Sequence, residues 1–242
     1  LAKAVSEKDI RVNAKQKMVL NDSVQADGQL TLNGSDIELS SADVMVSDAI
    51  LISEHDIRMD DSHIGASQNL TIQSSGEVNV SESELLSKGD IEIDSNSLRQ
   101  SGELQSNGKI IINVNESVQN NGEILGGDNV SILANGDVMQ TDGSTIQSNG
   151  DVLIDVEKTV QNNGFIIGKT KVEINANDDV VQLGGVIQSD DSISIESANG
   201  KFLQKENSAV QALGDIDINT EKGIVLDQSN ISSEALISLT SR

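Results

Sequence analysis

Short apolar-x-apolar pairs recur along the chain at nearly constant intervals. The pairs are Ile10/Val12, Leu30/Leu32, Ile50/Ile52, Leu70/Ile72, Ile91/Ile93, Ile110/Ile112, Val130/Ile132, Val152/Ile154, Val172/Ile174, Ile193/Ile195, Ile216/Ile218 and Ile237/Leu239. Alternation of apolar and other residues is typical of a half-buried β-strand. Since the pairs return about every twenty residues, the chain is predicted to be a repeat architecture with one such strand per unit.

Two further apolar columns follow each pair. The second column is Leu20, Leu39, Met59, Val80, Leu98, Val118, Val138, Val160, Val180, Phe202 and Ile224; the third is Val24, Val44, Ile64, Leu85, Leu104, Ile124, Ile146, Ile166, Ile187, Val210 and Ile231. Each unit therefore holds three short strands separated by polar turns. Stacking such units predicts an all-β fold, a parallel β-helix of about twelve coils, with residues 1–242 as one repeat segment.

Composition and charge narrow the function classes. The chain of 242 residues has no Pro, Cys, Trp or Tyr, only two Phe, and a formal net charge of −23. Such acidity argues against nucleic-acid binding, which needs clustered Lys and Arg. No apolar run approaches the length of a membrane span, so no membrane insertion is expected. The low aromatic content does not indicate disorder, because the apolar residues are strictly periodic.

Glutamines recur beside the second column. They are Gln100, Gln119, Gln140, Gln161, Gln182, Gln204 and Gln228, and two of them lie in the near-identical turns V-Q-N-N-G at residues 118–122 and 160–164. Stacked amides can bond from one strand to the next, as in cross-β ladders. We therefore expect a Gln ladder between coils, and a destabilising effect of leucine at position 161.

One charged stretch, SEHDIRMDDSH at residues 53–63, is the strongest enzyme-like cluster. Together with the preceding coil it gives a candidate surface cluster of Glu38, His55, Asp56, Arg58, Asp60, Asp61 and His63. By strand parity, Arg58 shares the outer face with Asp56 and Asp60, and Glu38 lies one coil away. A polysaccharide-cleaving face and a metal-binding histidine pair are two possible functions. A solvated charge cluster is favoured over both, since the chain offers no aromatic platform for a sugar.

Several other polar features have an ordinary structural interpretation. The acidic pairs Asp60/Asp61, Asp178/Asp179 and Asp190/Asp191 are candidates for calcium, but turn residues are favoured. No metal or cofactor site is predicted. Asp90 and Lys109, and likewise Asp151 and Lys171, directly precede their strands, so they are expected to be neighbours on adjacent coils.

The repeat resembles those of the filamentous haemagglutinin family, bacterial exoproteins exported by two-partner secretion. The units KIIINVNESVQNNGEILGG (109–127) and DVLIDVEKTVQNNGFIIG (151–168) carry the resemblance. It implies a right-handed β-helical shaft, secreted or on the bacterial cell surface. Its partners would be a receptor on a host or neighbouring cell and an outer-membrane transporter for the parent protein.

The resemblance leaves more than one function open. A non-enzymatic shaft for adhesion or cell–cell contact is favoured. The alternatives are the delivery stalk and receptor-binding part of a contact-dependent growth inhibition toxin, and a β-helical polysaccharide-processing enzyme. Neither LAKAVSEKD at the start nor SLTSR at the end has the pattern of a solenoid cap. We therefore expect the repeat to continue in both directions in a longer parent.

Overall fold

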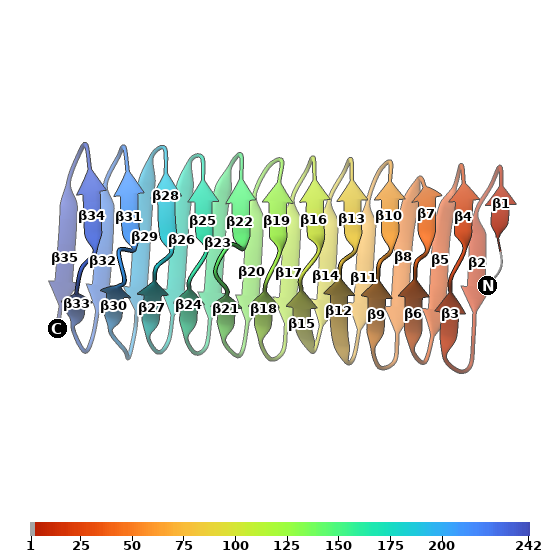
Figure 1. The fold of residues 1–242 in the computed structure, drawn as a ribbon, viewed down its shortest axis with the longest axis horizontal. Coiled ribbons are helices and arrows are strands. Elements are labelled where there is room, and N and C mark those ends of the chain that lie inside the picture. Colours follow the sequence, from red (N-terminus) through yellow and green to blue (C-terminus); the bar gives the residue numbers. More distant parts are fainter. Residues whose placement is uncertain (1–2) are drawn as a thin grey trace.

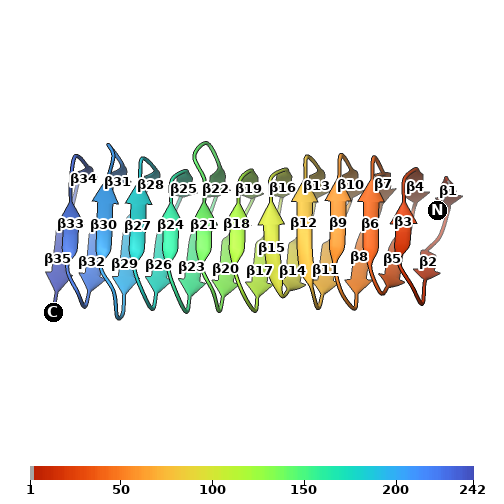
Figure 2. The ribbon, with the colours of Figure 1, turned by 60° about the horizontal axis from the view of Figure 1, so that its bottom comes forward.

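The computed structural model, which describes residues 3–242, is a right-handed parallel β-helix with three faces (Figures 1 and 2). Successive coils stack along one axis, and each strand pairs in parallel with its equivalent in the next coil. With a strand spacing of about 4.8 Å, the stack is a rod roughly 50–60 Å long. The predicted fold class is confirmed. Leu1 and Ala2 of the expected uncapped start lie outside the described residues.

Each face of the rod is one sheet. Sheet A contains β1 (Ala4–Ser6), β4 (Ser23–Ala26), β7 (Asp43–Val46), β10 (His63–Ala66), β13 (Glu84–Ser87), β16 (Glu103–Ser106), β19 (Glu123–Gly126), β22 (Thr145–Ser148), β25 (Phe165–Gly168), β28 (Val186–Ser189), β31 (Ala209–Ala212) and β34 (Asn230–Ser233). Sheet B contains β2 (Ile10–Asn13), β5 (Gln29–Gly34), β8 (Asp48–Ser53), β11 (Leu70–Ser74), β14 (Ile91–Ser95), β17 (Ile110–Val114), β20 (Val130–Ala134), β23 (Asp151–Val156), β26 (Lys171–Ala176), β29 (Ser192–Ser197), β32 (Ile216–Thr220) and β35 (Ile237–Ser241). Sheet C contains β3 (Met18–Leu20), β6 (Ile37–Ser40), β9 (Ile57–Asp60), β12 (Glu77–Ser81), β15 (Ser97–Gln100), β18 (Val118–Asn120), β21 (Val138–Gln140), β24 (Val160–Asn162), β27 (Val180–Leu183), β30 (Phe202–Lys205) and β33 (Ile224–Leu226).

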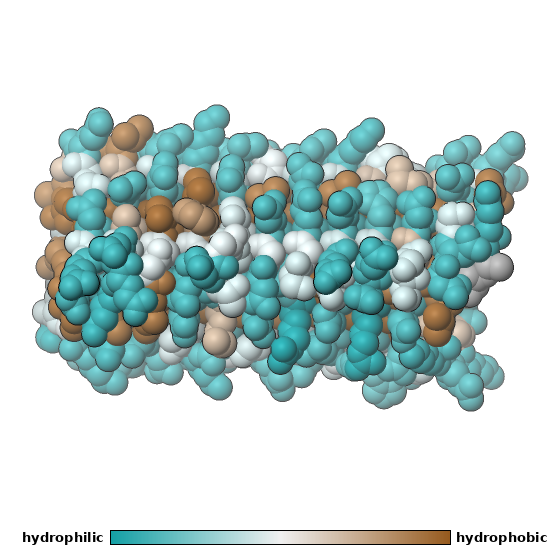
Figure 3. All heavy atoms as spheres, in the orientation of Figure 1, coloured by the Kyte–Doolittle hydropathy of each residue, from teal (hydrophilic) through white to brown (hydrophobic). Residues whose placement is uncertain are grey.

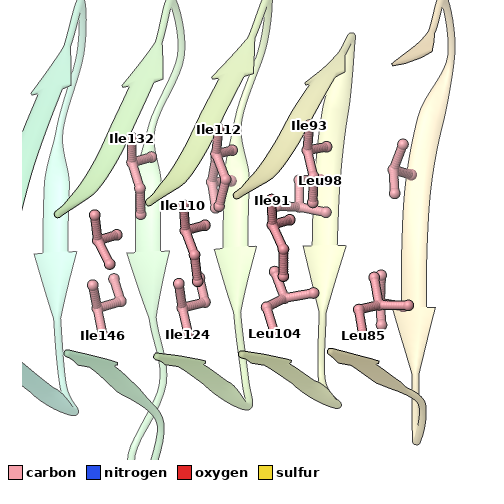
Figure 4. Packing of buried hydrophobic residues seen from close by; sticks show 14 of the residues in the cluster. Leu85, Ile91, Ile93, Leu98, Leu104, Ile110, Ile112, Ile124, Ile132 and Ile146 are labelled. Carbon is pink, nitrogen blue, oxygen red and sulfur yellow. The ribbon is translucent and has the colours of Figure 1, made fainter. Parts of the chain in front are cut away.

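The interior is a stack of aliphatic layers. In one coil, for example, Ile110 and Ile112 of sheet B meet Val118 of sheet C and Ile124 of sheet A. Figure 4 shows the equivalent residues of neighbouring coils lying in rows, Leu85, Leu104, Ile124 and Ile146 among them. The rows explain the preference for Val, Ile and Leu, because β-branched and aliphatic side chains pack well on a pleated surface.

One predicted pair in the first column is wrong. The inward residues of β8 are Ala49 and Leu51, which pair with Leu30 and Leu32, so Ile50 and Ile52 face outward. The run Ala-Ile-Leu-Ile is apolar throughout, so the sequence pattern does not show which of its residues point inward. Asp48 fixes which residues of β8 point inward. It must stand directly before the first inward residue to accept the backbone N–H of Asn69 at 3.2 Å.

The predicted second column is also wrong in its register at one point. Leu98 stacks on Val78, and Gln100 stacks on Val80, so Val80 and Leu98 are not equivalent positions. Sheet C has two inward positions per strand, and from β15 to β30 the second of them carries an amide. In β33 this position is Leu226. The third column is confirmed at every described position, because its members pair in sequence along sheet A.

Residues 3–242 are strands and turns, and they include no helix that could cross a membrane.

Candidate functional site

The charged cluster predicted around Arg58 is spread over more than one face of the rod. Glu38 and Arg58 do occupy equivalent positions on β6 and β9, as predicted. The guanidinium of Arg58 donates to Asp56 Oδ2 at 2.5 Å, and Glu38 forms its ion pair with Lys17. Asp60 lies at the end of β9. The Arg58 guanidinium is therefore held by a carboxylate at the start of its own strand.

The two histidines lie on different sides of the coil. His55 is in the turn between β8 and β9, where its Nδ1 is 3.2 Å from the carbonyl oxygen of Ser35. His63 opens β10 on sheet A, and its Nδ1 is 3.3 Å from Glu84 Oε2. Within residues 3–242, no group of three or more His, Cys, Asp or Glu side chains is arranged to hold a metal ion.

The acidic pairs act in turns. Asp61 has a left-handed backbone (φ 47°) at the corner after β9 and accepts the Ser41 hydroxyl at 3.2 Å. Asp179 Oδ1 accepts the backbone N–H of Lys201 at 3.0 Å. The N–H of Asp191 donates to Ser189 Oγ at 3.1 Å. These contacts support the interpretation of the pairs as turn residues.

A column of buried amides lines the inside of the corner between sheets C and A. Its members, one per coil, are Gln100, Asn120, Gln140, Asn162, Gln182 and Gln204. Gln140 is 2% exposed, and its Nε2 donates to Ser144 O at 3.0 Å and to Phe165 O on the next coil at 2.8 Å. The other three glutamines make the same pair of bonds. We call these six residues the amide column.

The asparagines of the column form hydrogen bonds in the shorter turns. Asn120 Oδ1 accepts the N–H of Gly122 at 3.2 Å, and Asn162 Oδ1 accepts that of Gly164 at 3.1 Å. Asn120 Nδ2 also reaches Thr145 O on the next coil at 3.2 Å. The amide column thus bonds to backbone in the corner, both within a coil and between coils.

The predicted Gln ladder is therefore corrected in membership and in bonding. Gln119 and Gln161 face outward and donate to Asn121 and Asn163 of their own turns. Gln228 lies in an exposed turn with φ 50°. In V-Q-N-N-G the strand parity directs the first Asn inward, not the Gln. Among the described residues, no two amides of the column bond to each other.

A second ladder follows the corner that leads into sheet B. Here an Asp or Asn stands just before the first inward residue of the strand, and its Oδ1 accepts the backbone N–H of the equivalent residue in the next coil. The acceptors, which we call the Asx ladder, are Asp9, Asp48, Asn69, Asp90, Asn129 and Asp215, at 2.8–3.2 Å. The predicted proximity of Asp90 and Lys109 is one rung of this ladder, and Asp151 and Lys171 are also paired in register. Part of the acidity of the chain is therefore structural.

Three glutamates are stacked in register on the outer face of sheet A. Glu84, Glu103 and Glu123 occupy equivalent positions on β13, β16 and β19. Partial burial raises the pKa of Glu103, and the charges of Glu123 and Glu84 raise it further. On sheet B, the hydrogen bond from Lys171 to Glu173 lowers the pKa of Glu173, and one from Asn175 adds to the effect.

An open groove follows the corner between sheets B and C across six coils. Its floor is made of the small side chains Ser53, Ser74, Ser95, Val114, Ala134 and Val156. Its polar walls are Gln73, Asp94, Asn113, Asn115, Asn135, Asp155 and Glu157, and the hollow has a volume of about 730 Å³. The lining includes no Lys, Arg or His, so a ligand here would be neutral or cationic.

Two carboxylates of the groove, Asp94 and Asp155, do not have the separation of a glycosidase pair. Asp94 and Asp155 are three coils apart, which corresponds to about 14 Å. Paired catalytic carboxylates lie about 5–10 Å apart. Asp94 also accepts the side-chain N–H of Asn113 at 2.8 Å.

Exposed apolar side chains concentrate on the later coils. They include Phe165, Leu213, Val225, Leu226, Leu236, Ile237 and Leu239. Figure 3 shows apolar patches gathered toward the end of the rod where these coils lie, while most of the visible surface is hydrophilic.

Sequence reasoning missed the amide column's asparagines, the Asx ladder and the groove. The Asx ladder has a readable signal, because an Asp or Asn directly before the first strand of a unit recurs in half of the coils. The groove has no such signal in the sequence, because the equivalent wall positions vary between Ile, Gln, Asp, Asn and Leu. Comparisons with protein-family models, with curated proteins and with solved structures give no match to this chain.

Proposed function

We propose that this chain is a rigid, non-catalytic shaft segment of a large secreted or surface-exposed bacterial exoprotein. It holds a distal part away from the cell for adhesion or cell–cell contact. The observation that carries the proposal is the register of the three sheets, which runs without interruption from β1 to β34, from β2 to β35 and from β3 to β33.

The proposal rests on the mechanics of this stacking. Bending the rod would separate backbone hydrogen bonds on one of its three sheets, and the amide column and the Asx ladder add side-chain bonds across the same coil boundaries. The chain has 39 Asp and Glu against 16 Lys and Arg, and the net charge of −23 keeps such rods apart in solution. The charged cluster around Arg58 has the contacts of a solvated cluster.

The test places the whole chain between a surface anchor and a small receptor-binding tip. A variant without residues 110–151 removes two complete coils, because Val152 is two coils from Ile110 in the same register. A shaft predicts a folded protein whose tip lies nearer the surface by about 10 Å. A matched deletion of residues 110–139 removes one and a half coils and should abolish folding.

Two results would contradict the shaft. One is a tip height unchanged by the in-register deletion, as expected for a flexible tether. The other is saturable binding of the tipless chain to cells that is lost on substitutions in the groove, which would make the segment itself the adhesive part.

A further inference from the structure

The chain contains seven Asn-Gly dipeptides, and their backbone environments differ. They begin at Asn33, Asn107, Asn121, Asn135, Asn149, Asn163 and Asn199. Asn-Gly is the sequence most prone to spontaneous deamidation, because glycine has no side chain to hinder attack by its backbone nitrogen. That nitrogen must be free to approach the Asn side chain, so a hydrogen bond from its N–H opposes the reaction.

Five of the seven glycines lie in turns and have this N–H engaged, three with a carbonyl of the preceding coil and two with a side chain of their own turn. Gly108 donates to Gly89 O at 3.0 Å, Gly136 to Glu116 O at 2.7 Å, and Gly150 to Asp128 O at 2.9 Å. Gly122 and Gly164 donate to the amide column at 3.2 and 3.1 Å. Gly34 lies inside strand β5, paired with β8.

Gly200 is the exception. Its N–H has no hydrogen-bond partner among residues 3–242, although the flanking N–H groups do. Asn199 N–H donates to Asn177 O at 2.7 Å, and Lys201 N–H donates to Asp179 Oδ1 at 3.0 Å. The turn therefore leaves one backbone donor unpaired, directly after an exposed asparagine.

An inserted residue explains the unpaired donor. Three residues separate β26 from β27 in one coil, but four, Ala198 to Lys201, separate β29 from β30 in the next. The backbone N–H groups of Ala198 and Asn199 donate to the carbonyls of Ala176 and Asn177. The carbonyl of Asp178 accepts the hydroxyl of Ser197 at 2.6 Å. The insertion thus displaces Gly200 from the pattern that protects the equivalent turns.

We propose that Asn199 is the site of selective spontaneous deamidation in the folded protein. The Gly200 nitrogen attacks Cγ of Asn199 and forms a C–N bond, giving a five-membered succinimide. The Cγ–Nδ2 bond breaks, and the Gly200 N–H proton leaves with the side-chain nitrogen as ammonia. Water then opens the ring at either carbonyl, which yields aspartate or isoaspartate.

The modification would alter one coil boundary. Isoaspartate adds one backbone atom to a turn that already has an extra residue. The new carboxylate also replaces an amide that donates to Asn177 Oδ1 at 2.7 Å, next to Asp178 and Asp179. Both changes loosen the stacking of β30 on β27. Slow deamidation at this site would therefore destabilise the later coils as the protein ages.

The experiment ages the whole folded chain at mildly alkaline pH and quantifies deamidation at each Asn-Gly by peptide mass mapping. We expect Asn199 to convert about tenfold faster than the five paired sites, since one backbone hydrogen bond must break before each of them can react. In denaturant, all seven should convert at similar rates.

A variant lacking Ala198 restores the shorter turn and is the matched control. It should lower the rate at Asn199 to that of Asn135, whose Gly136 N–H is paired. Asn199→Gln should abolish conversion at this position and keep the later coils protected from hydrogen exchange on ageing. Equal rates at all seven sites in the folded chain, or faster conversion at a paired site, would overturn the proposal irrespective of whether the deletion variant folds.

Discussion

The early and the late coils build the corner between sheets C and A in two different ways. In the early coils the second inward residue is aliphatic: Leu20, Leu39, Met59 and Val80. Three of these coils then turn through a left-handed residue that is not glycine, Ser41, Asp61 or Glu82, with φ 47–51°. In the later coils from β15 to β30, a residue of the amide column stands in place of the apolar residue.

Side chains in the two corners bond to different backbone groups. In the early coils, buried serines accept backbone N–H groups of the preceding coil: Ala42 N–H donates to Ser62 Oγ at 3.1 Å, and Ser62 N–H to Ser83 Oγ at 3.0 Å. In the late coils, amide side chains donate to backbone carbonyls. The early corners at Ser41, Asp61 and Glu82 carry backbone strain, about 1–2 kcal/mol for a left-handed residue. Among the corners of the amide column, only the one after Gln204 has left-handed residues other than glycine, Glu206 and Asn207. The late corner instead depends on a buried amide that is stable only while bonded.

Removing a bonded amide should have the largest effect. Gln140→Leu removes the side-chain donor that bridges the carbonyls of Ser144 and Phe165, and we expect a loss of about 2–3 kcal/mol in the free energy of unfolding. Ser144 O keeps the backbone N–H of Phe165 as a donor. Gln161→Leu, on the outer face of the next strand, should cost less than about 0.5 kcal/mol. Denaturant titration of both variants measures the contrast, and similar losses would refute the inward position of the amide column.

A glycine substitution at the corner into sheet B should cost the same in both regions. A Cβ on Gly89 would collide with Asn69 Oδ1, and one on Gly150 with Asn129 Oδ1. We expect either alanine substitution to cost roughly 1–3 kcal/mol, because the Asx ladder must shift. Thermal or denaturant unfolding tests this, and a large difference would mean that the two regions differ at more than one corner.

Relieving strain should stabilise the corner after β12 but not the equivalent corner after β15. Glu82 has φ 47°, so Glu82→Gly should stabilise the protein by about 0.5 kcal/mol after the entropic cost of glycine. Ser101 begins the equivalent turn in the next coil without a positive φ, and Ser101→Gly should destabilise by about 0.5–1 kcal/mol. Effects of the same sign in both variants would contradict the proposed difference in strain.

The smallest effects concern charge and pH. The pKa of Glu103 is raised, so its protonated form stabilises the fold, and this contribution is lost as pH rises through the folded-state pKa. Glu103→Gln should therefore stabilise by a few tenths of a kcal/mol at neutral pH and have no effect in acid. The pKa of Glu173 is lowered, so its charged form stabilises the fold above the unfolded-state pKa.

Glu173→Gln serves as the control of opposite sign. It should destabilise slightly at neutral pH, and the effect should fade as pH falls through the folded-state pKa. Melting temperatures across pH, at low and high salt, check both variants, since salt screens exposed charges. Stabilisation by both substitutions at neutral pH would mean that net charge alone governs the response.

Apolar alternation predicts most of the fold, because each strand exposes one face to the interior and one to solvent. It fails where both faces are apolar, as in Ala49–Ile52, and there the position of Asp48 decides the parity. It also fails where a buried position is polar. Gln100 and Asn120 look like turn residues in the sequence, and only the register of sheet C shows that they point inward.

Hydrogen exchange of side-chain amides, measured by NMR, tests the inward amide column most directly. The Nε2 protons of Gln100, Gln140, Gln182 and Gln204 each donate two bonds to buried carbonyls. They should exchange as slowly as the backbone of the same coils, while those of Gln119 and Gln161 exchange at once. Immediate exchange of all six glutamines would show that the late coils do not close their corner with buried amides.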